Sequence, residues 1–216
     1  MKILGTGCVV LVTLLFGSLA LADTWVEDFD LENVDEWNEV VGEWNTEEGG
    51  YAETAGTDYA KTMFGDETWT NYTVEVDVTL AENVSTNAVG ILVRADENGD
   101  NGYRFWIRTD SQNAQFSKWE NNAYVHLEQP ALPVEVGETY NLKMVMDGDV
   151  LQCFVNDELV VDLKNDFRDS GRVGLISYRA YPRYDNLVIT GENIPTNLAV
   201  QPEGKLAAYW GKIKSL

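Results

Sequence analysis

The sequence is poor in cysteine, histidine, proline and basic residues. Its 216 residues include two cysteines, one histidine and five prolines, and 15 lysines and arginines stand against 36 aspartates and glutamates. The single histidine, His126, removes most routes to a nucleophilic triad or a histidine-based metal site. The formal net charge of −21 argues against nucleic acid or anionic lipid as a partner of the whole chain, because both are polyanions.

Long apolar runs are also absent, except at the N-terminus. Residues 1–22 begin with Lys2, continue through the apolar stretch 9–21, and end in Ala20-Leu-Ala22, a small-x-small cleavage site before Asp23. The apolar stretch is too short, and too promptly followed by acidic sequence, to favour a spanning helix. We therefore expect a signal peptide over 1–22 and a secreted protein, at the cell surface, in the medium or in the periplasm, with no transmembrane segment after cleavage.

Cleavage before Asp23 leaves Cys153 as the only cysteine. No intramolecular disulfide can then form, so stability must come from a hydrophobic core. The remaining chain carries 14 basic and 36 acidic residues, a net charge of −22. Cys153 lies in the alternating segment 151–155 and is predicted to be a small buried hydrophobe. A chain of about 190 residues can form such a core as one all-β domain.

Alternation of apolar and polar residues dominates the remaining sequence, and no long helical pattern interrupts it. This period of two predicts strands with one face on a core and one face free, as in antiparallel sheets. The predicted strands cover residues 72–80, 89–94, 103–108, 142–146, 150–155, 159–163, 173–178 and 187–190. Asp147-Gly148, Asn156-Asp157 and Asn121-Asn122 separate neighbouring strands with residues that tolerate the positive φ angles of tight turns.

A boundary follows Gly191. The domain is expected to span 23–191, and residues 192–216 read as a linker and a basic aromatic tail. If the tail is helical, one face carries Leu206, Tyr209, Trp210 and Ile213. Two interpretations stay open: a docking tail for a protein partner at the cell surface, or a terminus whose aromatic side chains pack on the domain.

Several segments together resemble a known superfamily. They are Trp44 with Glu48-Gly-Gly-Tyr51, the strand 72–77, Asn87-Ala-Val-Gly-Ile-Leu-Val-Arg94, Asn101-Gly-Tyr103, Asn156-Asp157 and Gly171-Arg-Val-Gly-Leu-Ile176. In layout, residues 25–190 resemble the concanavalin A-like superfamily of lectins, laminin-G-like domains and glucanases, and within it the 3-keto-disaccharide hydrolase group. The resemblance implies a two-sheet antiparallel jelly-roll sandwich that handles sugars.

The catalytic motif of the laminarinase-type members is incomplete here. That motif resembles Glu-x-Asp-x-x-Glu on one strand, with two carboxylates placed for retaining hydrolysis. Glu75-Val-Asp77 begins it, but Leu80 occupies the second glutamate position. If the protein is an enzyme, Glu75 and Asp77 are its candidate catalytic residues. Otherwise we expect them to pair across the sheet with Arg94 or Arg104.

A cluster of arginines and aromatic residues suggests sugar binding instead. Aromatic rings stack on the apolar face of a pyranose, and arginine and amide groups bind its hydroxyls. The candidate carbohydrate-binding residues are Arg94, Arg104, Trp106, Arg108, Trp119 and Glu120. The alternative is a salt-bridged outer sheet face with Trp106 packed against a loop.

Metal binding is the last candidate function. Asp96-x-Asn98-x-Asp100 begins like a calcium loop, but Asn101 and Ile107 stand where an EF-hand has glycine and glutamate. The superfamily resemblance implies instead one structural calcium ion between the first and last strands, with Asp28 and Asp185 as ligands.

Three hypotheses follow. The leading one is a secreted, non-catalytic, lectin-like module that binds an extracellular glycan or oligosaccharide. The second is a glycoside or 3-keto-sugar hydrolase of the same fold. The third is a structural cell-surface module that docks through its C-terminal tail.

Overall fold

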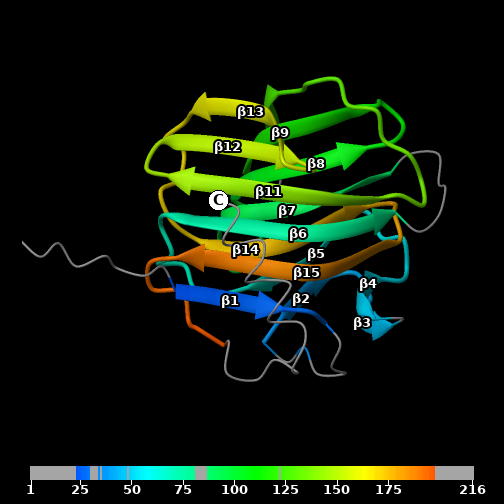
Figure 1. The fold of residues 1–216 in the computed structure, drawn as a ribbon, viewed down its shortest axis with the longest axis horizontal. Helices are drawn as coiled ribbons and strands as arrows, with labels where there is room; N and C mark the ends of the chain where they lie inside the picture. Colours follow the sequence, from blue (N-terminus) through cyan, green and yellow to red (C-terminus); the bar gives the residue numbers. More distant parts are fainter. Residues whose placement is uncertain are drawn as a thin grey trace, which may run out of the picture.

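The computed structural model describes residues 23–29, 34, 36–47, 49–80, 87–121 and 123–197, and this part folds into two antiparallel sheets packed face to face (Figure 1). The signal peptide expected at 1–22 and tail residues 198–216 lie outside the described residues. Within the described ranges all named elements are strands, and none of these residues forms a helix that could cross a membrane.

Sheet A has eight strands. Its order is β13 (Glu158–Lys164), β12 (Val150–Val155), β11 (Thr139–Asp147), β6 (Tyr72–Leu80), β15 (Pro182–Gly191), β4 (Gly50–Glu53) and β3 (Trp44–Glu47), and β1 (Asp23–Glu27) also pairs with β15. In Figure 1 it forms the near layer, from β13 at the top to β1 at the bottom.

Sheet B has seven strands. Its order is β10 (Ala123–Glu128), β9 (Asn113–Glu120), β8 (Gly102–Arg108), β7 (Ala88–Ala95), β14 (Arg172–Tyr178), β5 (Ala60–Phe64) and β2 (Asn38–Val41). Strands adjacent in the sheet are often distant in the chain, as where β14 lies between β7 and β5, which is the connectivity of a jelly roll rather than of a simple meander.

The predicted fold class and strands are confirmed. All eight segments predicted from alternation lie within strands, and β6 is buried at every second residue, from Tyr72 to Leu80. These side chains meet those of sheet B, such as Ile91 and Phe105, in one large core. Cys153 is fully buried there, and burial raises the pKa of its thiol well above the usual value. It is the small hydrophobe that its segment predicted.

The predicted turns are also present where the structure describes them. Asp147 pairs with Val150, so Gly148 and Asp149 alone close the hairpin, and Gly148 has a φ of 57°. Asn156 and Asp157 close the next hairpin with φ angles of 50° and 65°, as a tight type I′ turn requires.

Strand β7 departs from simple alternation because all eight of its residues are buried. Two tyrosines of sheet A reach across the core to its backbone. The Tyr184 hydroxyl accepts a hydrogen bond from the Gly90 amide (3.1 Å) and lies 2.8 Å from the Ile176 carbonyl, to which it can donate. The Tyr72 hydroxyl accepts from the Arg94 amide (2.6 Å). Burial raises the pKa of both phenols, so they stay protonated donors at any ordinary pH.

Tyr184→Phe should therefore destabilise the domain without changing its shape. The substitution leaves the buried Gly90 amide without its side-chain acceptor, and we expect the free energy of unfolding to fall by about 1–3 kcal/mol. Denaturant unfolding followed by tryptophan fluorescence measures the change. Tyr124→Phe, at a side chain that is 44% exposed, is the matched control. An equal effect of the two substitutions would contradict the role given to Tyr184.

Candidate functional site

The outer face of sheet B carries a second, smaller cluster of buried side chains. We call it the β8 face, because Arg104, Trp106 and Arg108 project from β8 at every second residue. Its other members come from the adjoining strands and from the loop before β5: Gln115, Ser117 and Trp119 of β9, Tyr124 and His126 of β10, and Tyr59. Four of the predicted carbohydrate-binding residues therefore share the outer face of sheet B: Arg104, Trp106, Arg108 and Trp119.

Arg104 lies at the centre of this face, inside a cage of aromatic rings. Its guanidinium carbon is 3.5 Å from the ring centroid of Trp106, 4.7 Å from that of Trp119 and 4.6 Å from that of Tyr124. The residue is 0% exposed. Nη2 is 3.4 Å from the Ser117 hydroxyl, whereas Nε and Nη1 have no hydrogen-bond acceptor among the described residues.

Burial dominates the electrostatics of Arg104. The pKa of its guanidinium is lowered to about 9, mainly by desolvation and in smaller part by the charge of Arg108, while Tyr59 and Tyr124 act in the opposite direction. The rings compensate only in part, because a cation over an aromatic face gains about 0.5–2 kcal/mol. His126, whose Nδ1 is 3.0 Å from the Ser117 hydroxyl, has a lowered pKa through burial and the two arginines. It is therefore predominantly neutral near pH 7.

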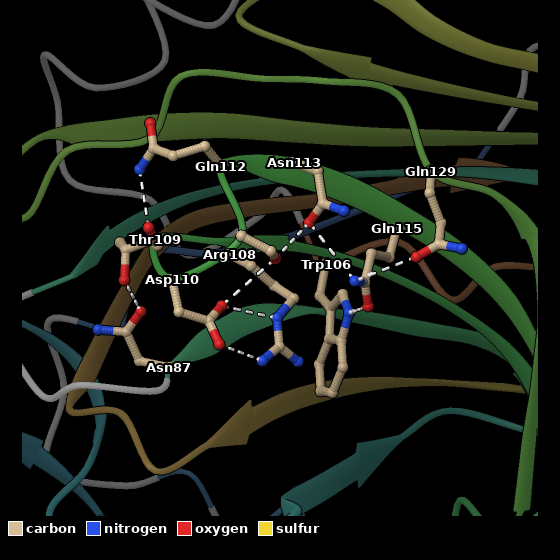
Figure 2. Close-up of polar contacts among 10 residues, drawn as sticks. Asn87, Trp106, Arg108, Thr109, Asp110, Gln112, Asn113, Gln115 and Gln129 are labelled. Atoms are coloured by element: carbon tan, nitrogen blue, oxygen red, sulfur yellow. Dashed lines mark hydrogen bonds and ion pairs between the residues drawn. The ribbon is translucent and has the colours of Figure 1, made fainter.

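Trp106 is held in place by its neighbours on either side. On β7 the facing residue is Gly90, where a Cβ atom would lie 2.4 Å from the Trp106 Cβ and 2.1 Å from the Phe105 carbonyl oxygen. Only glycine leaves room for this close approach. On β9 the Gln115 side chain accepts a hydrogen bond from the indole Nε1 at 2.8 Å (Figure 2).

A polar group of side chains continues the face beyond Trp106 (Figure 2). Arg108 makes a two-point ion pair with Asp110, with distances of 2.9 and 2.7 Å, and its guanidinium carbon is 5.5 Å from the Trp106 ring centroid. Gln115 donates weakly to Asn113 (3.4 Å) and lies 3.5 Å from Gln129. The face thus changes from aromatic to amide and charged groups within a few side chains.

Loops cover much of the β8 face. The Tyr59 ring lies nearly parallel to Trp106, with centroids 6.4 Å apart, and edge-on to Trp119 at 5.2 Å. The loop from Asp96 to Asn101 covers the neighbouring part of the outer side of sheet B, over β5 and β7: Lys61 bonds to Asp100 at 2.7 Å, and Gly99 lies next to Met63 and Leu92. Trp106 is consequently 2% exposed, so the ring predicted to stack on a sugar lies beneath other side chains. Tyr124, at 44%, is the exposed ring of the cage.

The structure separates Arg94 and Glu120 from this group. Arg94 has a φ of 47° at a register shift of β7, which removes it from the alternation of the strand. Its side chain donates instead to the carbonyl oxygens of Thr70 (3.2 Å) and Arg168 (3.0 Å). Glu120 follows Trp119 on β9, so it projects from the opposite side, and it pairs with Lys118 at 3.6 Å.

The expected pairing of Glu75 and Asp77 with Arg94 or Arg104 is wrong. Both acids lie on the outer face of sheet A, whereas both arginines belong to sheet B. Glu75 is 3.6 Å from Lys143, and Asp77 accepts hydrogen bonds from Asn141 (2.8 Å) and Asn186 (3.1 Å). The prediction failed because alternation in sequence does not say which strands become neighbours.

The calcium ligands stay a prediction. Asp28 directly follows β1, whose last residue Glu27 pairs with Leu187, two positions from Asp185. The fold thus brings both acids to one region of sheet A, and Asp28 is buried. The described residues contain no group of three or more histidine, cysteine, aspartate or glutamate side chains arranged to hold a metal. A calcium ion there would need backbone carbonyls to complete its six to eight oxygen ligands.

Sequence reasoning missed the residues that complete the face. Tyr124 and Gln115 could have been found, because each continues a period-two pattern, Gln115 on β9 next to β8 and Tyr124 on β10 next to β9. Tyr59 carries no such signal: it lies in a loop, with a φ of 56°, 47 residues before Trp106 in the chain.

Known proteins resemble this chain over most of the domain. Levanase from Bacillus subtilis (strain 168) is 25% identical over 168 residues, which is 77% of this chain but 24% of levanase. The solved carbohydrate binding module CBM66 from Bacillus subtilis superposes with a TM-score of 0.68 and 23% identity, covering 72% of this chain and 96% of the module. A Bacillus licheniformis β-glucanase superposes with a TM-score of 0.59 at 12% identity, covering 79% and 99%.

These superpositions confirm the concanavalin A-like jelly roll. A family model described as the 3-keto-alpha-glucoside-1,2-lyase-like domain matches residues 24–190, almost the range covered by the described strands. The chain belongs to this family of 3-keto-alpha-glucoside-1,2-lyase-like domains.

Proposed function

We propose that this domain is a secreted, non-catalytic module that binds an extracellular carbohydrate through the β8 face. The observation that carries the proposal is the arrangement around Trp106: an aromatic cage with an exposed tyrosine lies directly beside amide and arginine groups. Sugars present both an apolar ring face and a rim of hydroxyls, so a site for them needs these two surfaces side by side.

Each half of the face has a distinct part in this proposal. The exposed Tyr124 ring offers the stacking surface, while the buried Trp119 and Arg104 support it from beneath. Asn113, Gln129 and the Arg108–Asp110 pair offer donors and acceptors for hydroxyl groups. The hydrogen bond from Trp106 to Gln115 fixes the boundary between the two halves.

The relatives support the same reading. One solved relative is named as a carbohydrate binding module, and its whole length superposes on most of this chain. Levanase matches over a segment that is about a quarter of its own length. Such a segment is consistent with an accessory module, and levan is therefore one of the glycans to test. An extracellular glycan as partner also agrees with the signal peptide expected at 1–22.

The absence of catalysis is proposed from the distribution of acids. On the described strands β7, β8 and β9, no residue turned to the β8 face is aspartate or glutamate, and the one carboxylate that the site includes, Asp110, is paired with Arg108. Hydrolysis by the usual mechanism needs two carboxylates facing one glycosidic bond. Glu75 and Asp77 lie on sheet A, already hydrogen-bonded to Asn141.

A glycan array with the purified protein, extended to polysaccharides including levan, tests the proposal. We expect saturable binding to a restricted set of glycans and no release of reducing sugar from them. Release that Glu75→Gln abolishes would establish the hydrolase instead. Absence of binding to every glycan would overturn the proposed function and favour the third hypothesis, a structural module that docks through its C-terminal tail.

Tyr124→Ala should weaken glycan binding about tenfold, since it removes the exposed stacking surface, and tenfold corresponds to about 1.4 kcal/mol. Isothermal titration with the best array ligand measures the change. Val125→Ala is the matched control, because Val125 is the next residue of β10, is 55% exposed and projects from the opposite side of the strand. Equal losses in the two variants would place the ligand elsewhere.

Calcium removal should affect stability but not glycan binding. The proposed ion lies between Asp28 and Asp185 in sheet A, whereas the proposed glycan site lies on sheet B. We expect a chelator to lower Tm by a few degrees, since a ligand that binds only the folded state stabilises it. Scanning calorimetry with calcium and with chelator measures the change in Tm. An unchanged Tm would contradict the proposed calcium ion. Loss of glycan binding in chelator would place calcium in the binding site instead.

A further inference from the structure

Three N–H donors of the aromatic cage have no acceptor in the part of the chain that the structure describes. They are Nε and Nη1 of Arg104 and Nε1 of Trp119, all buried and unpaired among the described residues. A buried donor left unpaired is costly, and a buried charge without a partner more so. Each such group in a native fold calls for an explanation, and a bound ligand is one that also accounts for the charge of Arg104.

Arg94 shows how the same chain satisfies a buried arginine that has a structural role. It is 1% exposed, and its Nε and Nη1 each donate to a backbone carbonyl oxygen, at 3.2 and 3.0 Å. The corresponding two nitrogens of Arg104 make no such bonds. Both arginines are buried, so burial does not explain the difference. The two guanidinium groups differ in the hydrogen-bond acceptors around them.

The charges around Arg104 are positive or already paired. Arg108 lies on the same face of β8, and its two-point pair with Asp110 uses both carboxylate oxygens of that acid. Lys61 is paired with Asp100. Among the described residues the cage therefore holds one uncompensated positive charge, although the chain carries a net charge of −21.

We infer that the cage receives the carboxylate of an acidic sugar, with Arg104 as the residue that selects it. This inference rests on the proposed function and names the class of its ligand. A carboxylate offers only acceptors, and it can form two parallel hydrogen bonds with Nη2 and one of the two unpaired nitrogens of Arg104. Hydroxyl groups, which bring a donor with each acceptor, match a group that carries only donors less well.

The charge of the whole chain restricts the ligand further. A polyuronate would be repelled along its length by a protein with a net charge of −21. A glycan with a single acidic residue at its end meets the positive cage without that penalty. Access passes Tyr124, whose ring lies over Arg104 and which is 44% exposed on the edge strand β10.

Paired probes test the inference on the purified protein. Oligosaccharides that end in one glucuronyl, galacturonyl or sialyl residue are titrated beside the methyl esters of the same compounds, with the intrinsic fluorescence of the cage tryptophans as readout. We expect at least one free acid to bind about tenfold or more tightly than its ester, because esterification removes the charge and keeps the rest of the sugar. We also expect this preference to shrink at high salt.

Variants of the two buried arginines separate a binding role from a structural one. Arg104→Met should abolish the preference for the acid while leaving Tm unchanged or raised, because removing a buried unpaired charge costs no stability. Arg104→Lys should retain a weaker preference, since it keeps the charge without the fork. Arg94→Met is the matched control: it should lower Tm and leave the preference intact.

The outcomes distinguish the inference from the proposed function. Equal affinity for acids and esters, or tight binding of neutral glycans alone, overturns the inference and leaves carbohydrate binding standing. A fall in Tm of Arg104→Met as large as that of Arg94→Met, with the acid preference retained, also overturns it. If no glycan binds, both the inference and the proposed function are wrong.

Discussion

Two tyrosine hydroxyls that cross the core hold the strand on which the rest of sheet B depends. Tyr184 and Tyr72 come from sheet A and bond to the backbone of β7 at Gly90 and Arg94. These bonds are buried, and an unpaired amide in their place would be costly. They fix the distance between the sheets at β7, and β8 is laid against β7 from Ala88 to Val93. The position of Trp106 over Gly90 follows from this contact.

The β8 face is therefore best understood as a second small core built on the outside of the sandwich. Sheet A shows one-sided burial, as β6 alternates between buried and half-buried residues, whereas β7 is buried throughout. Tyr59 and the loop from Asp96 to Asn101 cover the outer side of sheet B. Covering both sides of a sheet makes it rigid, so side chains projecting from β8 have fixed positions. A binding site gains affinity from such preorganisation, because fewer groups must be ordered when the ligand arrives.

How much of this could be predicted from the sequence depends on the range of each interaction. Local alternation correctly predicted the strands and placed Arg104, Trp106 and Arg108 on one face. It could not predict that Glu75 and Asp77 lie on the other sheet, because sheet order depends on contacts distant in the chain. It also failed at Arg94, where a φ of 47° breaks the period, and at Tyr59, whose loop carries no periodic signal. The core was thus predictable, while the cover over Trp106 was not.

The contrast between the two buried arginines bears on how a fold retains a function. Packing alone would favour an apolar residue at position 104, since three aromatic rings already surround it and no carboxylate of the described residues pairs with it. A charge there lowers stability unless a partner arrives, whereas Arg94 contributes to stability at once through carbonyl oxygens. Stability and binding therefore make opposite demands on position 104. An arginine at this position is what a site selected for a ligand would retain, and a site selected for folding alone would not.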